Sequence, residues 1–403
     1  MSGEPDKTVT ILGATGSVGC ATLDILRQQR KELGDDAIVL EALSANTNWQ
    51  KLAELALEFR PKFVALAEPA HADELTAALS GTGIEIGFGP QAIDMAAARD
   101  ANWVMAAITG AAGLRSVLIA AKRGCSLALA NKESLVCAGS LLMETCARHG
   151  TTLLPVDSEH NAIFQVFDPA KKALVRRIIL TASGGPFLHW DKPKIAKATP
   201  AQAIAHPVWS MGAKISVDSA SLMNKGLELI EARHLFDVSP SQLEVLVHPQ
   251  SVVHGLVEYK DGSMLAQLGA PDMRVPIASA WGWPHRIPTS CESLLLADIG
   301  RLDFENPDLD RFPALGLAIA AMKIGGNACN ALSAANEIAV ASFLQGKLGF
   351  FKIAETVEYV LEHGDDHGNA WNGEPESIDY VFDVDQRARR ACHDRIATLQ
   401  NPF

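Results

Sequence analysis

Short apolar runs alternate with helical patterns over the first 150 residues of the chain. The strand-like runs are TVTIL, AIVLEALS, KFVALA, GIEIGFG, NWVMAAI and SLALA. Between the first three runs, apolar residues at helical spacing predict one helix through Leu23 and Leu26 and another around Trp49 to Phe59. This alternation is typical of a parallel, doubly wound sheet, in which the carboxyl ends of the strands carry a ligand.

The pattern changes after about residue 150. Longer strand-like runs, RRIILTA, LEVLVHP, SVVHGLVEY and SMLAQLG, predict a mostly antiparallel sheet, with one helix beginning near Ser219. A segment rich in Pro, Asp and Leu then predicts a connecting arm, and four segments with helical spacing predict a helical bundle. We therefore expect an α/β protein with an N-terminal Rossmann-like doubly wound parallel sheet, a central α+β domain and a C-terminal helical bundle. The expected boundaries are 1–152 for the first domain, 153–288 for the second, 289–312 for the arm and 313–403 for the bundle.

Composition narrows the class of protein. The chain has 403 residues, enough for two or three domains, and its 48% hydrophobic and 20% charged residues are typical of globular proteins with sizeable cores. A net charge of −12 without a dense Lys/Arg run argues against nucleic-acid binding. No stretch gives about 18 consecutive apolar residues, so we expect no membrane span. The opening MSGEPDKTVTILG lacks the pattern of a secretory signal, which predicts a cytoplasmic protein.

A glycine-rich turn follows the first predicted strand. TVTIL runs into GATGSVG (13–19) and then into the helical stretch CATLDIL. Glycines let the backbone turn tightly and approach a pyrophosphate, while the N–H groups of the following helix attract its negative charge. The pattern predicts dinucleotide binding at Gly13 and Gly16. The alternative is a strand-to-helix turn that binds nothing.

The end of the second strand bears on which dinucleotide binds. A free ribose 2′-hydroxyl favours an acidic residue at this place, whereas the sequence there, residues 44–48, is SANTN. The missing acid weakens the case for NAD and permits NADP. No Arg or Lys follows the strand before Lys51, so NADP is not established either.

Asn131, Lys132 and Glu133 follow SLALA, another strand of the same predicted sheet. At the carboxyl end of a parallel strand, Lys132 would face the ligand crevice. A helix start with a solvated Lys and Glu explains the spacing equally well.

Two carboxylates lie two positions apart in PVDSEHNAIFQ (155–165), directly after the apolar segment TTLL. In an extended segment Asp157 and Glu159 point to the same side, so their oxygens can converge on one hard cation. Oxygen ligands favour Mg²⁺ or Mn²⁺ over zinc. The alternative is an Asp N-cap with a capping-type Glu that opens a helix.

A third ligand is available in KISVDSASLMNKGLE (214–228). We expect Ser219 near the start of a helix and Asn224, Lys225 and Glu228 on one of its faces. Hydroxyl, amide and ammonium groups near a helix N-terminus suit a phosphate, and Glu228 suits a metal beside it. The alternative is an exposed Lys/Glu pair.

Two loops could complete an anion site. Ser183 and the two glycines after it follow the strand RRIILTA and could donate hydroxyl and N–H groups. AIAHPVWSMGAKIS, which contains His206 and Trp209, could form a mobile lid near residues 203–213 that covers a bound ligand. A surface loop with a packed Trp is the competing interpretation.

Together these segments resemble a known family. ILGATGSVG, LANKESLV, PVDSEHNAIFQ, TASGGPF, HPVWSMGAKISVDSASLMNKGLE and HPQSVVHG occur in this order over residues 11–255. GNACNALSAANEIAV extends the match into the helical tail. In these motifs the chain resembles the 1-deoxy-D-xylulose 5-phosphate reductoisomerases of the non-mevalonate isoprenoid pathway, and long ungapped motifs of this kind are very specific.

The resemblance implies a homodimer whose subunit has an NADPH-binding domain, a catalytic domain and a helical bundle joined by an arm. The implied cofactor contacts are Gly13, Thr15, Gly16, Ser17, Val18, Asn46, Asn48, Asn131, Glu133 and Gly212. The implied substrate contacts are Lys132, Ser158, Glu159, Ser183, His206, Trp209, Ser219, Asn224, Lys225 and Glu228. The implied ligands of Mg²⁺ or Mn²⁺ are Asp157, Glu159 and Glu228, and these three with Lys132 and His206 are the implied catalytic residues. A basic residue often follows the second strand in this family, and its replacement here by NTN (46–48) leaves the strength of the NADPH preference open.

The reaction implied by the resemblance begins with a ketose phosphate, 1-deoxy-D-xylulose 5-phosphate. A metal chelated by its carbonyl and hydroxyl oxygens would stabilise the enediolate formed when a carbon–carbon bond breaks. The recombined branched aldehyde would take a hydride from NADPH to give 2-C-methyl-D-erythritol 4-phosphate. Binding of the phosphate would hold the fragments together and draw the lid closed. Lys132 and a metal-bound water are the candidates for the general base.

Two other functions compete with this interpretation. A semialdehyde dehydrogenase built on the same sheet needs an activated Cys, but none of the seven cysteines lies in a Gly/Asn-rich turn beside a suitable base. They also form no CxxC pair, so we expect neither a disulfide framework nor a thiolate zinc site. A catalytically silent NADP(H) sensor would have no need of the three metal ligands and the phosphate residues. Metal-dependent turnover distinguishes a sensor from an enzyme.

Overall fold

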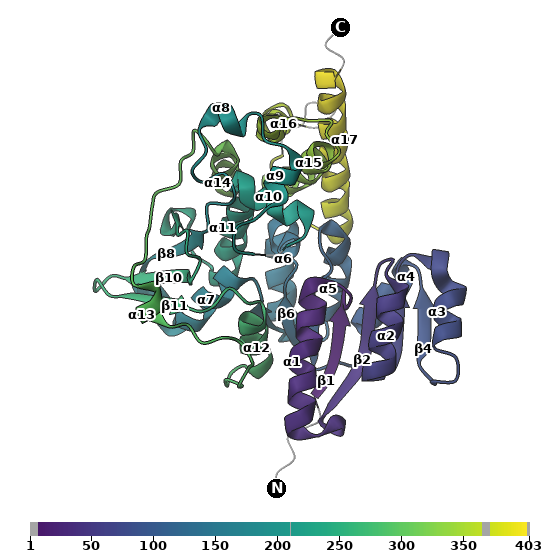
Figure 1. The fold of residues 1–403 in the computed structure, drawn as a ribbon. Coiled ribbons are helices and arrows are strands. Elements are labelled where there is room, and N and C mark those ends of the chain that lie inside the picture. The colour runs from purple at the N-terminus through teal and green to yellow at the C-terminus, as the bar shows by residue number, and fades with distance from the viewer. Residues whose placement is uncertain (1–6, 210, 365–370, 401–403) are drawn as a thin grey trace. The chain divides into compact units, whose positions relative to one another are not determined.

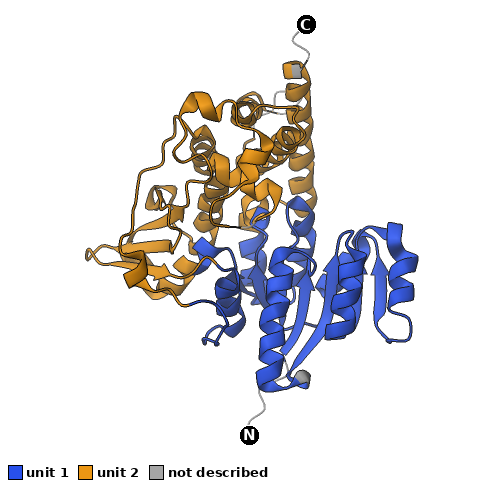
Figure 2. Cartoon of the chain, viewed as in Figure 1, with its two compact units in different colours: residues 1–134, 142–161, 272–292 blue, residues 135–141, 162–271, 293–403 orange. Residues whose placement is uncertain are grey.

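The computed structural model describes residues 7–209, 211–364 and 371–400. The chain divides into two compact units, each assembled from separate stretches of sequence (Figures 1 and 2). Unit 1 comprises residues 1–134, 142–161 and 272–292, and unit 2 comprises residues 135–141, 162–271 and 293–403. The four-part division drawn from the sequence stays a prediction. In the part of the chain that the structure describes, no helix is both long and apolar enough to cross a membrane.

Unit 1 is built around a parallel sheet of seven strands in the order β4-β3-β2-β1-β5-β6-β7. The strands are β1 (Lys7–Leu12), β2 (Ile38–Ala45), β3 (Phe63–Leu66), β4 (Glu85–Phe88), β5 (Trp103–Ala106), β6 (Ser126–Leu129) and β7 (Thr152–Pro155). Val9, Ile11 and Leu12 of β1 are fully buried, because helices cover both faces of a doubly wound sheet. All six strands expected in the first 150 residues are present.

The helices of unit 1 fall into two groups. The crossovers from β1 to β4 contain α1 (Ser17–Leu33), α2 (Trp49–Phe59) and α3 (Ala72–Ala78). Those from β4 to β7 contain α4 (Pro90–Ala98), α5 (Leu114–Ala121) and α6 (Glu133–His149), of which residues 135–141 are assigned to unit 2. The chain crosses the sheet in opposite directions in the two groups, so right-handed crossovers place them on opposite faces. A later helix, α12 (Arg274–Gly282), contacts α1, β6 and β7 and covers the sheet beside α1.

Unit 2 contains a four-stranded sheet in the order β11-β10-β8-β9. Its strands are β8 (Val175–Ala182), β9 (Leu243–Val247), β10 (Val253–Tyr259) and β11 (Met264–Leu268). β10 pairs antiparallel with both β8 and β11, while β8 and β9 are parallel. The predicted sheet, mostly antiparallel, is therefore confirmed.

The helices of unit 2 include the predicted bundle. Its members are α14 (Pro313–Ile324), α15 (Asn327–Leu344), α16 (Phe350–His363) and α17 (Ile378–Gln400). The other helices are α8 (Lys192–Ile195), α9 (Pro200–Ile204), α10 (Ala213–Ser221), α11 (Met223–Phe236) and α13 (Leu296–Ile299), and α7 (Ser158–Val166) crosses the boundary between the units. A Cβ atom added at Gly226 of α11 would lie 2.3 Å from Cβ of Ala318 in α14. Glycine is therefore required for the close packing of α11 on α14.

The prediction of a helix beginning near Ser219 is wrong. Ser219 lies in the last turn of α10, which starts at Ala213, and α11 begins at Met223. The two helices are separated by Leu222, whose backbone is left-handed with φ 61°. A non-glycine residue rarely adopts this conformation, so the sequence pattern gave no indication of the break.

Candidate functional site

The glycine-rich turn lies at the point where the strand order of the parallel sheet reverses. Leu12 at the end of β1 pairs with Ala106 at the end of β5, and strands on the two sides of this pair are connected in opposite directions. Gly13 has φ +88°, and a Cβ atom there would lie 2.7 Å from the carbonyl oxygen of Ala107. Such a reversal at the carboxyl ends of parallel strands is where doubly wound sheets bind ligands.

The turn leads directly into α1. Gly16 is the N-cap of α1 and offers no side-chain cap to the first-turn N–H groups. Gly16 and Ser17 are exposed, while Thr15 and Val18 are half-buried. The first turn of α1 is thus open to an anion, and a helix N-terminus attracts one.

Ser44, at the end of β2, is a residue whose role was not predicted from the sequence. Its buried hydroxyl accepts a hydrogen bond from the N–H of Gly13 at 3.0 Å, and its carbonyl accepts one from Ala14 at 2.7 Å. The sequence could have indicated this role, because the neighbouring parallel strands β1 and β2 end at the same edge of the sheet, which places Ser44 beside the glycine-rich turn. After Ser44, Asn46 and Asn48 are exposed, and Asn48 Oδ1 caps α2 by accepting from the N–H of Lys51 at 3.1 Å.

Asn131 lies at the same edge, directly after β6. Its Nδ2 donates to the carbonyls of Ile108 at 2.6 Å and Gly110 at 2.9 Å, and its Oδ1 accepts from the N–H of Ser134 at 2.8 Å. Asn131 therefore ties the loop after β5 to the start of α6. The segment is indeed a helix start, since α6 begins at Glu133, but Glu133 is 7% exposed and is not solvated.

The expected extended geometry of Asp157 and Glu159 is also wrong, and the N-cap alternative describes the backbone correctly. Glu159 lies in the first turn of α7, and Asp157 Oδ1 accepts from the N–H groups of Glu159 at 3.2 Å and of His160 at 3.4 Å. A short polar side chain before a helix satisfies donors that the helix leaves unpaired. The two carboxylates thus stand at a helix N-terminus, which favours negative charge.

Side chains of unit 1 hold Asp157 from two directions. Lys132 Nζ lies 3.2 Å from Asp157 Oδ2, and Nδ1 of the fully buried His160 lies 3.0 Å from Oδ1. The hydroxyl of Ser158 donates to Glu159 Oε2 at 2.5 Å. Lys132 is therefore an ion-pair partner of Asp157, and His160, which was not among the predicted site residues, orients the same carboxylate.

The predicted polar face of the 224–228 segment is confirmed within unit 2. Asn224 Nδ2 and Lys225 Nζ both donate to the carboxylate of Glu228. Glu228 is 1% exposed and Lys225 3%. An exposed Lys/Glu pair is thus excluded, and removing one partner of this buried pair would be destabilising.

Ser183 and His206 form a second polar pair in unit 2. His206 Nδ1 accepts from the N–H of Trp209 at 2.9 Å and of Val208 at 3.2 Å, so the proton of the neutral ring lies on Nε2. Burial lowers the pKa of His206 below its usual value, which favours that neutral form. Nε2 lies 2.9 Å from Ser183 Oγ, which also accepts from Gly185 N–H at 3.1 Å. With both donors aimed at Oγ, the Ser183 hydroxyl hydrogen is directed to other acceptors.

The loop that carries Ser183 packs on the end of α10. A Cβ atom at Gly185 would lie 2.9 Å from the carbonyl oxygen of Ser219. Trp209 of the predicted lid is half-buried, and its ring centroid lies 6.2 Å from that of His254. Ser210 of this segment lies outside the described residues. Unit 2 therefore brings the Ser183 loop close to Ser219, and Gly212 is the exposed N-cap of α10.

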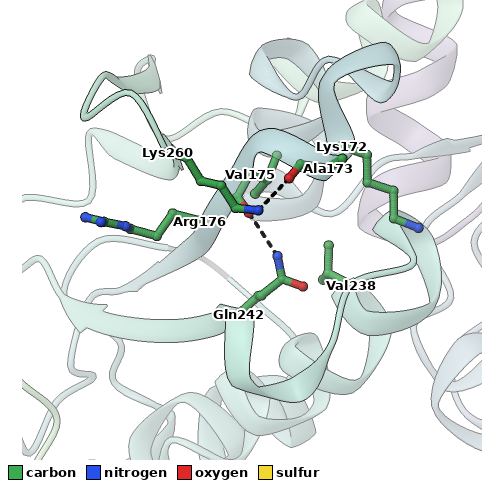
Figure 3. Close-up of a pocket in the computed structure, with 7 residues that line it drawn as sticks. All are labelled: Lys172, Ala173, Val175, Arg176, Val238, Gln242 and Lys260. Atoms are coloured by element: carbon green, nitrogen blue, oxygen red, sulfur yellow. Dashed lines mark hydrogen bonds between the residues drawn. The ribbon is translucent and has the colours of Figure 1, made fainter.

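A surface pocket of about 850 Å³ in unit 2 is lined by none of the predicted site residues (Figure 3). Its lining residues are Lys172, Ala173, Val175, Arg176, Val238, Gln242 and Lys260. Lys172 pairs with Asp237, Arg176 lies 3.0 Å from Glu258, and Lys260 donates to the carbonyl of Ala173 at 2.7 Å. Lys172 and Arg176 thus have carboxylate partners, whereas Lys260 is held by a neutral carbonyl.

Most of the cysteines are buried thiols. The seven cysteines form no disulfide, and five of them, Cys125, Cys137, Cys146, Cys329 and Cys392, are buried. Burial raises the pKa of Cys329 and of Cys392 to about 12. A thiol with such a pKa is almost entirely protonated near neutral pH, which counts against the semialdehyde dehydrogenase alternative.

Three family models match the chain in succession. They are 1-deoxy-D-xylulose 5-phosphate reductoisomerase over residues 9–139, its C-terminal domain model over residues 153–236 and a second C-terminal domain model over residues 268–391. The 1-deoxy-D-xylulose 5-phosphate reductoisomerase of Rhodospirillum centenum is 53% identical over 395 residues, which are 98% of this chain and 96% of that one. The chain belongs to the 1-deoxy-D-xylulose 5-phosphate reductoisomerase family.

Another relative and two solved structures are also similar to the chain over nearly its full length. The reductoisomerase of Caulobacter vibrioides is 49% identical over 391 residues, 97% of each chain. A solved reductoisomerase from Zymomonas mobilis, in complex with NADPH, is 48% identical and superimposes with a TM-score of 0.90 over 97% of this chain and 99% of that one. Another solved reductoisomerase, in complex with NADPH, fosmidomycin and magnesium, is 42% identical, with a TM-score of 0.90 over 98% of this chain and 99% of that one. The resemblance drawn from the sequence motifs and the predicted fold class are confirmed.

Proposed function

We propose that this chain is an NADPH-dependent reductoisomerase that converts 1-deoxy-D-xylulose 5-phosphate into 2-C-methyl-D-erythritol 4-phosphate. The observation that carries the proposal is its similarity, over 98% of its length, to a reductoisomerase solved with NADPH, fosmidomycin and magnesium. When bound, a divalent cation would act as a Lewis acid toward the substrate oxygens and NADPH would supply the hydride. Oxidation of NADPH in the presence of this ketose phosphate tests the proposal.

The residues of unit 1 fit a dinucleotide. The turn that begins at Gly13, held by Ser44, presents the uncapped first turn of α1, so Thr15, Gly16, Ser17 and Val18 would hold the phosphates. Asn131 and Glu133 lie at the same edge of the sheet and would contact the nicotinamide half. Exposed Asn46 and Asn48 would contact the adenosine ribose, and Gly212 would approach from the lid.

Replacing Gly13 by Ala should weaken NADPH binding roughly tenfold or more. The added Cβ would stand 2.7 Å from Ala107 O and would push the turn away from the place of the pyrophosphate. Gly34 is the matched control, because it also has a positive φ, follows α1 and has open space around it. Gly34→Ala should cost only about 1–2 kcal/mol of stability, from left-handed strain. NADPH titration by fluorescence checks this; equal dissociation constants for the two variants would contradict it.

The proposed metal ligands are Asp157, Glu159 and Glu228. Three carboxylates match the hard-oxygen preference of Mg²⁺ or Mn²⁺. Asp157 and Glu159 belong to unit 1, where Lys132 and His160 fix Asp157, and Glu228 is buried in unit 2. A buried carboxylate is costly unless it is well compensated, and a bound cation would stabilise it.

The proposed substrate contacts divide by unit. Lys132, Ser158 and Glu159 lie in unit 1 and would bind the reacting end of the ketose. In unit 2, the groups suited to the phosphate come from Ser183, Ser219, Asn224 and Lys225. His206 Nε2 lies 2.9 Å from Ser183 Oγ and would orient that hydroxyl, and Trp209 would close over the ligand as part of a lid. Phosphate binding at a distance from the reacting carbons supplies energy that can orient them.

Lys225→Ala should raise the KM for the phosphorylated ketose roughly 10- to 100-fold. A hydrogen bond to a charged group contributes about 1.5–3 kcal/mol, and about 1.4 kcal/mol corresponds to a factor of ten. Lys192 of α8, with a half-exposed side chain paired to Asp310, is the control, and Lys192→Ala should leave the KM unchanged. Steady-state kinetics at saturating NADPH and metal provide the measurement. A Lys225→Ala enzyme with the KM of the wild type would remove Lys225 from the site.

The proposed assembly is a homodimer. β11 is an edge strand of the sheet of unit 2, and two of its apolar residues, Met264 and Leu265, are 45% and 48% exposed. An exposed apolar edge strand is a ready surface for pairing with a second copy. The location in the cytoplasm expected from the N-terminal sequence stays a prediction.

Leu265→Lys should therefore shift the chain toward monomers in sedimentation equilibrium. A Lys on an edge strand opposes pairing between strands. Leu57 of α2 in unit 1 is 50% exposed, and Leu57→Lys should leave the dimer intact. A Leu265→Lys protein that dimerises as tightly as the Leu57→Lys protein would exclude this edge from the interface.

A further inference from the structure

A buried polar link joins the C-terminal bundle to α10 inside unit 2. Asp218 of α10 is 1% exposed, and Asn336 of α15 is fully buried. Asn336 Nδ2 donates to Asp218 Oδ1 at 2.8 Å, across 118 positions of sequence. Lys214, one turn earlier on α10, lies 2.9 Å from Asp218 Oδ2. Each carboxylate oxygen of Asp218 therefore has a partner of its own.

The two partners of Asp218, Lys214 and Asn336, differ in whether they connect α10 to another helix. Lys214 lies on the same helix as Asp218 and is 28% exposed, so this ion pair compensates the charge of Asp218 within α10 itself. Asn336 lies on α15, which packs against α10, α16 and α17 (Figure 1). A buried carboxylate is costly unless its oxygens accept hydrogen bonds of good geometry. The Asn336 donor thus holds α10 at one position along the bundle.

The position of α10 controls two proposed phosphate contacts. Ser219 lies in its last turn, next to Asp218, and the Ser183 loop packs on the Ser219 carbonyl through Gly185. A shift of α10 would therefore move Ser183 and Ser219 together. We propose that Asn336 and Asp218 are positioning residues, which hold α10 so that the Ser183 and Ser219 hydroxyls meet the phosphate of the substrate. The inference rests on the proposed function, because that function places the phosphate at these serines.

Asn336→Ala is the primary test, with Asn330→Ala as its matched control. Asn330 is a buried Asn of the same helix, and its Nδ2 also donates at 2.8 Å, but to the carbonyl of Val381 in α17. Both variants lose one hydrogen bond donated by a buried Asn of α15. Asn336→Ala should raise the KM for the ketose phosphate at least tenfold, with a much smaller change in kcat. Asn330→Ala should leave the KM within about twofold of the wild type, since its bond does not reach α10.

Lys214→Met provides a second variant if Asn336→Ala fails to fold. Lys214 is partly exposed, so its replacement should be tolerated, and Asp218 would lose its other partner. The KM should rise in the same direction, by a smaller factor. Binding of inorganic phosphate, measured by calorimetry, gives a readout that needs no turnover. The phosphate affinity should fall in Asn336→Ala and in Lys214→Met but not in Asn330→Ala.

The outcomes separate this inference from the proposed function. A wild-type enzyme without turnover would overturn the proposed function, while the phosphate titrations of the variants would still report on α10. A wild-type enzyme that turns over, combined with equal KM values and equal phosphate affinities for Asn336→Ala and Asn330→Ala, would overturn the positioning role. A KM that rises only in the Asn336 and Lys214 variants supports it.

Discussion

Glu228→Gln should lower kcat about 100-fold or more and weaken activation by Mg²⁺, while NADPH binding stays close to that of the wild type. The substitution keeps the size of a side chain that is 1% exposed and removes its negative charge. Stabilisation of developing charge by a metal contributes several kcal/mol to a reaction, and about 1.4 kcal/mol is a factor of ten in rate. The proposed phosphate contacts of the dinucleotide lie in unit 1, so the cofactor should bind normally.

Glu244→Gln is the control for this experiment. Glu244 lies on β9 of the same unit and is 43% exposed, paired with Arg177 at the surface. It should turn over at the wild-type rate at every Mg²⁺ concentration. Steady-state rates over a Mg²⁺ titration and an NADPH titration of both variants supply the measurements. A Glu228→Gln enzyme with unchanged rate at limiting metal would show that Glu228 is not a ligand.

Gly226→Ala should have the second large effect, because it forces α11 away from α14. The new Cβ would lie 2.3 Å from Cβ of Ala318, far inside contact distance. Overpacking of this kind costs about 1–3 kcal/mol of stability. Since α11 also carries Asn224, Lys225 and Glu228, we expect a loss of activity beyond the loss of folded protein.

Two further variants make the Gly226 experiment specific. Gly316, on α14, has open space around it, so Gly316→Ala should raise the free energy of unfolding by about 0.5–1 kcal/mol and leave activity unchanged. Ala318→Gly combined with Gly226→Ala should restore both stability and turnover, because it removes the clashing methyl group. Urea unfolding and steady-state kinetics measure these effects. Failure of the double variant to recover would mean that the contact with Ala318 is not the cause.

The regular parts of both units could be predicted from the pattern of apolar residues. Buried parallel strands such as β3, FVAL, appear as continuous apolar runs, and the helices of the bundle show apolar residues at helical spacing. The glycine turn at Gly13 was recognisable because strand, glycines and helix follow one another directly. The 224–228 cluster was recognisable for a similar reason, since residues three and four apart on a helix are neighbours.

Local conformation at two motifs could not be predicted. Asp157 precedes a helix, and the same residues fit both an extended pair of ligands and an N-cap, because an N-cap residue is itself in extended conformation. At Leu222 an apolar residue adopts φ 61° between two helices, which no propensity indicates.

Contacts between residues far apart in the sequence could not be predicted either. The packing of Gly226 on Ala318 and the bond from Asn336 to Asp218 depend on how elements pack in unit 2. Ser44 and His160 were missed as well, although both stand next to predicted site segments. The role of Ser44 depends on the ends of β1 and β2 being neighbours, and the role of His160 depends on its contact with Asp157.

The measurement that tests the central claim most directly is the oxidation of NADPH, followed by absorbance, with 1-deoxy-D-xylulose 5-phosphate as the substrate. It should be made with Mg²⁺, with Mn²⁺ and after removal of divalent cations by a chelator, and with NADH in parallel. We expect NADPH consumption that requires both the ketose phosphate and a divalent cation; the NADH rate would show how strictly a chain with NTN at 46–48 selects its cofactor. Folded, NADPH-binding protein that consumes no NADPH under any of these conditions would contradict the reductoisomerase function.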